Sequence, residues 1–119
     1  MVMVNKALRN SKVKTSLPWF LSISIGLANP TEDGLTTNEE ASELNLWEEQ
    51  LERVIGAEHR FVYVGRTTCN GSRELLYYVD APGNLPATLK KLNEEDGARS
   101  FAYLFEKDDR WERVSAYLR

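Results

Sequence analysis

The run FVYVGRTTCNGSRELLYYV, residues 61–79, decides the fold, because it predicts two antiparallel strands closed by a tight turn. Phe61 to Thr68 and Arg73 to Val79 are rich in Val, Tyr and Thr, which favour strands. Asn70-Gly71 between them supplies the two positive φ values that a type I′ turn requires. We therefore expect a β-hairpin at the structural centre of the chain.

The two-residue turn fixes which side chains of the hairpin share a face. In this register Val64 pairs with Tyr77. One position further from the turn, Tyr63 pairs with Tyr78. Both faces mix apolar and polar residues, so the sequence leaves open which face is buried. One face carries Phe61, Tyr63, Gly65, Thr67, Glu74, Leu76 and Tyr78, and the other carries Val62, Val64, Arg66, Thr68, Arg73, Leu75, Tyr77 and Val79.

A strand and an amphipathic helix are expected before the hairpin. The strand runs from about Pro18 to Ile25, where side chains alternate between two faces. Thr36 and Thr37 each have a glutamate three residues on, which is a capping-box pattern, and the helix that they open ends at Gly56. Its apolar stripe consists of Leu44, Trp47, Leu51 and Val54. The rest of the helix is expected to be solvated, and it carries Glu39, Glu40, Glu43, Glu48, Glu49 and Glu52.

Three further elements are expected after the hairpin. Asn84 is a suitable N-cap for a short helix that reaches about Glu95. Arg99 to Glu106 alternates in the manner of a last strand, and Asp108 to Leu118 is compatible with a short terminal helix. The resulting order predicts an α+β fold of the ferredoxin-like β-α-β-β-α-β type, in which a four-stranded antiparallel sheet has two helices on one face.

Length and charge point to one small domain. The chain has 119 residues and a net charge of −3, and 42% of its residues are hydrophobic. Residues 17–119 are expected to form a single α+β domain, since the chain is too short for a second one. Residues 1–16 lack apolar periodicity and are interpreted as a flexible basic N-terminal arm. The acidic remainder argues against tight binding of a phosphate backbone.

The location expected from the sequence is the cytoplasm. Cys69 is the only cysteine, so an intrachain disulfide is excluded. A basic start followed by the apolar run Leu17 to Ala28 imitates a signal peptide, although the alternation within that run favours a strand. The same run is too short to span a membrane, which takes about 20 residues. We therefore expect no membrane association.

The residue inventory argues against most catalytic sites. His59 is the only histidine, so a Cys/His zinc site, a haem pair or an iron–sulfur cluster cannot form within the chain, and we expect no metal and no cofactor. Along one extended strand, His59 and Cys69 would lie about 33 Å apart, too far to act as nucleophile and base. The sequence has no P-loop and no nucleophile elbow. An enzyme is therefore disfavoured without being excluded.

The polar side chains with most binding potential gather at the hairpin. Arg66 and Arg73 lie diagonally on one face, and beside Tyr77 they offer a fork for an anion and a ring for stacking a base. The alternative interpretation is ordinary strand chemistry, in which charged residues keep the hairpin tip in solution. The candidate binding residues are Arg66, Thr67, Thr68, Asn70, Arg73, Glu74 and Tyr77.

Val64 to Tyr78 resembles the signature G-x-x-T-x-[ND]-G-x-R-[ED]-x-x-[FY]-Y of the bacterial family catalogued as domain of unknown function 695. Pro18-Trp19, the acidic run Glu48 to Leu51 and the Asp-x-x-Trp motif Asp108 to Trp111 agree in order, so the likeness covers about residues 17–118. The family is uncharacterised. In some bacterial proteins such a domain is joined to one that resembles the ribonuclease E regulator family B, and this association implies binding rather than catalysis.

Three hypotheses of different classes are left open. The leading one is a cytoplasmic, non-enzymatic interaction or regulatory module that binds a protein partner, as a monomer or a homodimer. The second is single-stranded nucleic-acid binding on an open sheet face through Arg66, Arg73 and Tyr77. The third is an enzyme centred on Arg66, Arg73 and Glu74, which needs a pocket at those residues. The face of the hairpin that the helices cover bears on all three.

Overall fold

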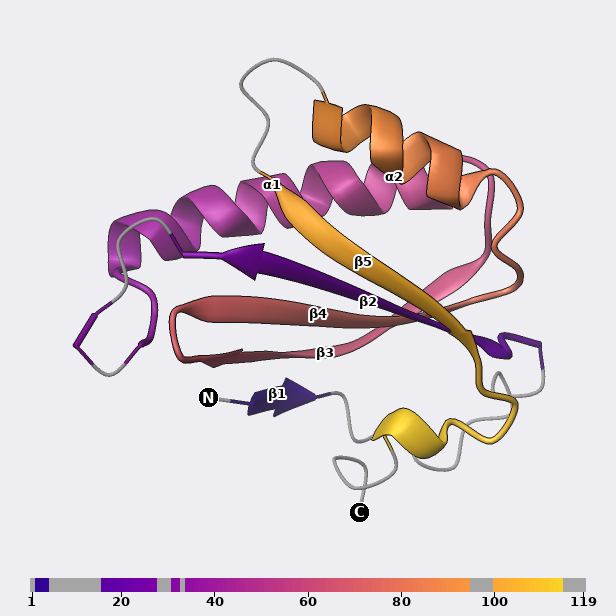
Figure 1. Ribbon diagram of the computed structural model, residues 1–119, viewed down its shortest axis with the longest axis horizontal. Coiled ribbons are helices and arrows are strands. Elements are labelled where there is room, and N and C mark those ends of the chain that lie inside the picture. Colours follow the sequence, from indigo (N-terminus) through magenta and orange to yellow (C-terminus); the bar gives the residue numbers. More distant parts are fainter. Residues whose placement is uncertain (1, 5–15, 28–30, 33, 95–99, 115–119) are drawn as a thin grey trace.

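The computed structural model describes residues 2–4, 16–27, 31–32, 34–94 and 100–114 (Figure 1). The helices are α1 (Asn38–Gly56) and α2 (Leu85–Glu94). The strands are β1 (Val2–Val4), β2 (Trp19–Gly26), β3 (Phe61–Cys69), β4 (Ser72–Val79) and β5 (Phe101–Lys107).

One antiparallel sheet holds all the described strands, in the order β1-β3-β4-β2-β5. The predicted mixed fold, with four antiparallel strands and two helices, is confirmed. β1 is a further strand, in which Val2–Val4 pair with Gly65–Thr67. It lies in the segment that the sequence analysis set apart from the domain, because three residues are too few to show a periodic pattern. Residues 5–15 of that segment lie outside the described residues.

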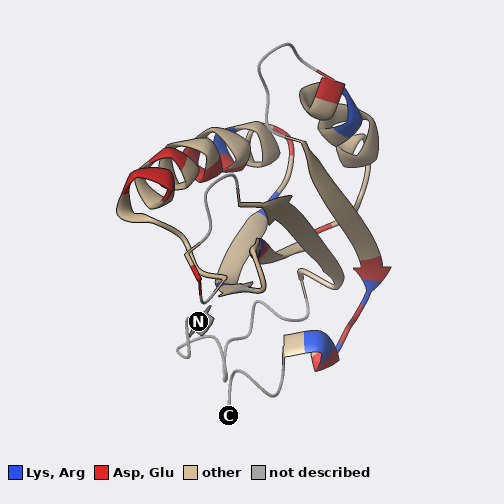
Figure 2. Cartoon of the chain, turned by 60° about the vertical axis from the view of Figure 1, so that its left-hand side comes forward, with Lys and Arg blue, Asp and Glu red and all other residues tan. Residues whose placement is uncertain are grey.

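Both helices pack on one face of the sheet, and the C-terminal 3-10 turn, Glu112–Val114, lies on the other (Figures 1 and 2). The larger core lies on the helix side and unites Leu21, Ile23 and Ile25 of β2 with apolar residues of both helices. The smaller core lies on the opposite face and consists of Leu17, Phe20, Val64, Leu76, Tyr78, Trp111 and Val114. The sheet is therefore buried on much of both faces.

A β-bulge at Val64 changes the predicted register of the hairpin. The pairs next to the turn, up to Gly65 with Leu76, are as predicted. Beyond the bulge Tyr63 pairs with Tyr77, so the predicted pairs of Val64 with Tyr77 and of Tyr63 with Tyr78 are wrong. The extra residue lets Val64 join the smaller core while Tyr63 packs on the helix side, so apolar side chains reach both layers.

The start and the end of α1 are as predicted, but its inward face is not. Thr37 is the N-cap and accepts a hydrogen bond from the Glu40 amide at 3.3 Å, and the helix ends at Gly56. Glu40 and Glu48 are only 2% and 8% exposed, so the expectation that they are solvated is wrong. The inward face of the helix is therefore rotated toward these two glutamates, and Trp47 and Val54 of the predicted apolar stripe are only half-buried.

The terminal helix predicted over Asp108 to Leu118 is a single 3-10 turn, Glu112–Val114, in the part that the structure describes. Trp111 precedes this turn with a φ of 56°, which interrupts an α-helix because L-residues rarely adopt it. Residues 115–119 lie outside the described residues.

The loop before α1 holds the tip of the hairpin. The Gly71 amide donates to the Gly34 carbonyl at 3.0 Å, and the Leu27 amide donates to the Gly71 carbonyl at 2.9 Å. Gly34 has a φ of +75°, and a Cβ on it would lie 2.7 Å from the Asn70 nitrogen. Only glycine satisfies this position without strain.

We expect Gly34→Ala to lower the free energy of unfolding by about 2 kcal/mol, because it combines a left-handed backbone conformation with a clash against the turn. Urea denaturation measures the effect. Gly26→Ala is the matched control, since its Cβ would meet nothing within 4 Å, and it is expected to change stability by less than about 0.5 kcal/mol. Equal stabilities of the two variants would contradict this account of the turn.

Candidate functional site

The register divides the predicted site residues between the two faces of the sheet. Arg66, Thr68, Arg73 and Tyr77 lie on the helix side, where α1 covers them. Asn70 is at the exposed tip of the turn, with a φ of 53°. The remaining two, Thr67 and Glu74, pair with each other and lie on the opposite face.

An ion-pair network occupies the helix side. Arg73 is 3% exposed, and its Nη1 donates to the Glu48 Oε1 of α1 at 3.1 Å. Arg66 Nη1 lies 3.5 Å from the other oxygen of the same carboxylate and donates to Asn45 Oδ1 at 3.2 Å. Burying these charges is tolerable because each guanidinium has the carboxylate beside it. The network thus anchors α1 to β3 and β4.

Tyr77 completes the covered surface. Its ring is fully buried and packs against Tyr63, with centroids 5.5 Å apart. Burial raises the pKa of its hydroxyl, and the charges of Glu52 and Glu48 raise it further, so the phenol stays neutral. The sheet face that single-stranded nucleic acid would need is therefore under α1 rather than open.

We expect Glu48→Gln to lower the free energy of unfolding by about 3 kcal/mol, because it leaves the buried Arg73 guanidinium without a counter-charge. Glu49→Gln, the exposed neighbour, is the control and is expected to change stability by less than about 0.5 kcal/mol. Chemical denaturation of both variants decides the point. A loss at Glu48 no larger than at Glu49 would show that the network does not anchor the helix.

The Asp-x-x-Trp motif fastens the C-terminal turn to the face opposite the helices. Trp111 stacks on Tyr78 with centroids 4.1 Å apart, and its indole Nε1 donates to the Leu17 carbonyl at 2.9 Å. Tyr78 donates to Asp108 Oδ2 at 2.6 Å, and the same carboxylate accepts from the amides of Glu112 and Arg113. Burial alone would raise the pKa of Asp108, but these hydrogen bonds outweigh it and hold the pKa below its ordinary value.

We expect Asp108→Asn to cost about 1 kcal/mol at neutral pH, because the carboxylate accepts three hydrogen bonds in the folded chain. A lowered folded-state pKa gives stability that is present above about pH 4 and is lost as the pH falls further. The difference between wild type and variant should therefore shrink below pH 4 in denaturation curves. Asp109→Asn removes the same charge without those bonds and serves as the control; an unchanged difference at low pH would contradict the assignment.

His59 also has a structural partner. Its Nδ1 lies 2.9 Å from Asp80 Oδ1, and a Cβ on Gly83 would come within 2.8 Å of its ring. The imidazole therefore ties the segment after α1 to the segment before α2. Of Cys69, the structure describes the backbone, at the end of β3.

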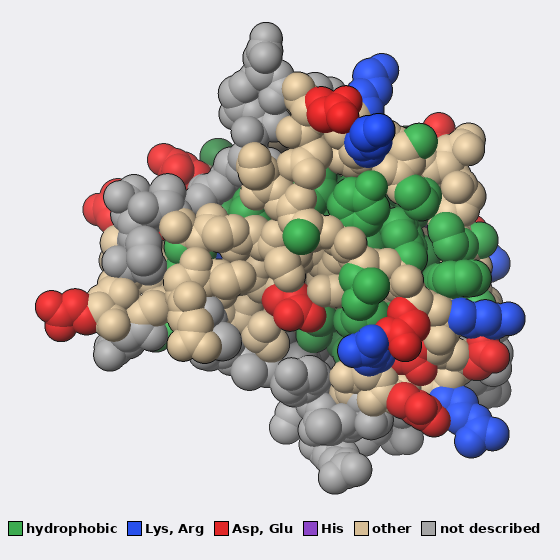
Figure 3. All heavy atoms as spheres, in the orientation of Figure 1, with side chains coloured by type: hydrophobic (Ala, Val, Ile, Leu, Met, Phe, Trp, Pro, Cys, Tyr) green, Lys and Arg blue, Asp and Glu red, His purple; other side chains and the backbone are tan. Residues whose placement is uncertain are grey.

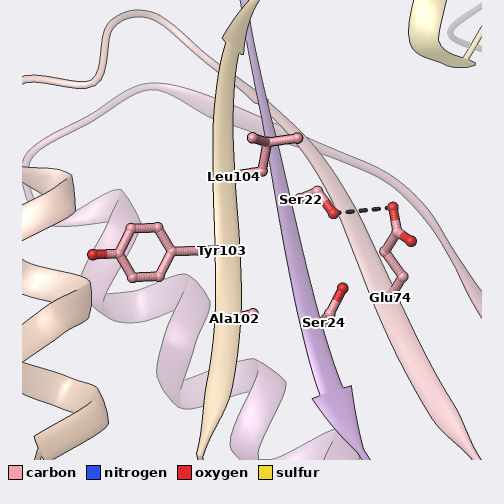
Figure 4. Close-up of a pocket in the computed structure, with 6 residues that line it drawn as sticks. All are labelled: Ser22, Ser24, Glu74, Ala102, Tyr103 and Leu104. Carbon is pink, nitrogen blue, oxygen red and sulfur yellow. Dashed lines mark hydrogen bonds between the residues drawn. The ribbon is translucent and has the colours of Figure 1, made fainter.

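A shallow cavity lies on the uncovered part of the face opposite the helices (Figure 4). Its volume is about 250 Å³, and its floor is built from small side chains of β2 and β5. Ser22 donates to Glu74 Oε1 at 2.9 Å, while the labelled Tyr103 side chain points away from the cavity, toward the helices. The lining residues are Ser22, Ser24, Glu74, Ala102, Tyr103 and Leu104.

Glu74 and Arg73 are adjacent in β4 and therefore point to opposite faces. The three residues of the enzyme hypothesis thus do not converge on one pocket. Within the described residues, His, Cys, Asp and Glu side chains do not gather in threes that would suit a metal ion. No helix of the same residues has the length and apolar content needed to cross a membrane.

The outer edge of β5 is the second open feature. Asn93 of α2 donates to the Phe101 carbonyl at 2.8 Å and accepts from the Phe101 amide at 3.0 Å. Because opposed residues of an antiparallel pair alternate between bonded and non-bonded pairs, Phe101 and Ile25 form a non-bonded pair. Tyr103 and Phe105 follow at intervals of two, so their amides and carbonyls also point away from β2.

Among the described residues, nothing pairs with the backbone of Tyr103 or Phe105 on that outer side. Leu104, between them, is 48% exposed and faces the side of the cavity. Figure 3 shows hydrophobic side chains gathered over the region of α2 and β5 on this side of the molecule. The edge therefore offers both hydrogen-bonding groups and apolar surface.

These features define a mixed α/β domain with one closed sheet face and one open strand edge. The chain belongs to a family of unknown function (DUF695), whose model matches residues 1–118. The family resemblance expected from the hairpin signature is thereby confirmed. No curated protein and no solved structure matches the chain. A link to the ribonuclease E regulator family is outside what these comparisons show and stays an expectation.

Sequence reasoning did not single out Asn93, Tyr103, Leu104 or Phe105 as functional. The alternation from Arg99 to Glu106 predicts the strand but not its place in the sheet, and only an edge position leaves backbone groups open. One signal was present: Leu104 sits on the polar side of the alternating strand. Binding by the hairpin residues stays a prediction.

Proposed function

We propose that this protein is a non-enzymatic interaction module that binds another protein chain through the outer edge of β5. The open backbone groups of Tyr103 and Phe105 carry the proposal. An extended segment pairs with such an edge through main-chain hydrogen bonds, and the side chains on its two faces provide specificity. The neighbouring cavity supplies a floor of small side chains on one face, and the row of Phe101, Tyr103 and Phe105 supplies an aromatic surface on the other.

β5 is the better suited of the two edge strands that the structure describes. β1 has 3 residues, and very short edge strands are a common protection against unwanted pairing. β5 has 7 residues and exposes Leu104 near its middle. Its charged residues, Glu106 and Lys107, stand at one end, so the central part of the edge stays available.

The exposed glutamates of α1 support the same class of function. Glu39, Glu43 and Glu49 are exposed, and Figure 2 shows acidic residues concentrated on this helix. Such a surface attracts a basic partner and speeds its association, but it does not fix a binding geometry. The edge of β5 would set the binding geometry, because main-chain hydrogen bonds define the position of an added strand.

Three finer points belong to the same proposal. The fold is of the ferredoxin-like β-α-β-β-α-β type, which the neighbour order β3-β4-β2-β5 supports. The protein acts in the cytoplasm, in keeping with a single cysteine in a small domain. Its partner is a protein rather than a nucleic acid, because the arginines that would contact phosphates are held by Glu48.

We expect Leu104→Lys to abolish partner binding, because a charge on an edge strand opposes strand addition. Leu46→Lys is the matched control, since Leu46 is 64% exposed but lies on the outer side of α1. A tagged form of the protein is used as bait in a cell lysate that also contains the untagged protein. Wild type and Leu46→Lys should recover the same partner, and Leu104→Lys should not.

Hydrogen exchange locates the contact. The amides of Tyr103 and Phe105 should exchange fast in the free chain and slow in the captured complex, because binding gives them hydrogen-bond partners. A complex that Leu104→Lys retains, with both amides still exchanging fast, would overturn the proposed function.

A further inference from the structure

We infer that the strand added at this edge is β5 of a second copy of the chain, paired antiparallel about a two-fold axis at Leu104. The inference rests on the proposed function, since it uses the same edge. It goes beyond it by identifying the partner and the register.

Backbone geometry leaves few two-fold registers. Residues whose amide and carbonyl point outward must face one another across the new pair. An axis at Tyr103 places Phe105 opposite Phe101, whose outward groups Asn93 already holds. An axis at Leu104 places Tyr103 opposite Phe105 in both directions. An axis at Phe105 places that residue opposite its own counterpart.

Side chains favour the axis at Leu104. In that register Leu104 faces the Leu104 of the other copy, so two exposed leucines cover each other. With the axis at Phe105, Leu104 would instead face Glu106 and set a carboxylate against an apolar side chain. On the helix side, Tyr103 and Phe105 form two cross-strand aromatic pairs, which are favourable neighbours in antiparallel sheets.

The same register continues a row of polar and small side chains from one copy into the other. Ala102, Ser24 and Glu74 form one row across β5, β2 and β4, and the two small residues leave the carboxylate accessible from the edge. Glu106 of the other copy stands opposite Ala102 and continues this row. Its carboxylate is already paired with Arg113 of its own copy, whose guanidinium lies over the Phe20 ring of β2, so it joins the row as one half of an ion pair and not as an unpaired charge.

The contact between Asn93 and Phe101 limits how much of β5 can pair with a second copy. Asn93 takes the place of a partner strand at Phe101 and limits the pairing to the part of β5 from Tyr103 onward. Two short strands bury less than the 1,200 Å² or so of a standard interface, so we expect a dimer that dissociates on dilution.

Disulfide trapping in the purified chain tests both partner and register. Across the proposed axis the two Leu104 residues form a non-bonded pair, with Cα atoms about 4.5 Å apart, which suits a disulfide. Leu104→Cys in a Cys69→Ser background should therefore form a covalent dimer under mild oxidation. Ala102→Cys in the same background is the control, because its counterpart would lie about 13 Å away, and it should stay monomeric.

Sedimentation velocity over a concentration series gives the second measurement. The wild type should show concentration-dependent dimer, and Leu104→Lys should weaken it roughly tenfold or more, because two like charges then face each other. Circular dichroism checks that each variant is folded.

The outcomes separate this inference from the proposed function. The inference is overturned if the wild type stays monomeric and Leu104→Cys forms no covalent dimer. The proposed function would still hold in that case if the Tyr103 and Phe105 amides exchange slowly in a complex with a different protein. Trapping by Phe105→Cys without trapping by Leu104→Cys would overturn the register. Dimer formation that leaves both amides in fast exchange would overturn the inference, because the two copies would then meet at another surface.

Discussion

The ion pair between Glu48 and Arg73 is the interaction on which the arrangement of the other elements depends. Arg73 lies near the start of β4, the central strand of the sheet, which pairs with both β2 and β3. A guanidinium there needs a carboxylate from the layer above, and α1 supplies it one helical turn after Leu44. A rotated or shifted helix would leave a buried charge alone, which is strongly unfavourable. The pair therefore specifies how α1 lies on the sheet and closes that face to ligands.

Much of the fold follows from local chemistry that the sequence displays. Asn70-Gly71 fixes the turn and the first pairs of the hairpin, and Thr37 with its glutamates fixes the start of α1. The bulge at Val64 does not follow, because a single valine gives no sign that it belongs to the opposite layer from Tyr63. Glu48 is hidden for a similar reason. Its inward position depends on Arg73, a residue 25 positions away that no local periodicity connects to it.

The family signature is explained largely by structure. Asn70 and Gly71 make the turn, and Gly71 accepts and donates hydrogen bonds to the preceding loop. Arg73 holds α1, Glu74 accepts from Ser22, and Tyr77 and Tyr78 fill the cores on opposite faces. The residues that first suggested a binding site thus have defined structural partners. A sequence pattern of charged and aromatic residues on a hairpin does not distinguish these two roles, because the distinction depends on which face a helix covers.

The backbone hydrogen-bonding groups that the fold leaves without partners among the described residues lie at the edge of the sheet. An antiparallel sheet always ends in two strands with half of their backbone groups unpaired, and natural proteins protect such edges by shortness, charge or a covering segment. β1 is short, and Asn93 covers the first residue of β5. Beyond Phe101 the same strand keeps open backbone groups on Tyr103 and Phe105 and sets an exposed leucine between these two residues. Protection against unwanted strand pairing does not explain why β5 is covered at its first residue and open in its middle, because a protected edge would have a charged residue such as lysine in place of Leu104. The combination is instead what strand pairing requires: open hydrogen-bonding groups, an apolar side chain to bury, and a stop that fixes the register.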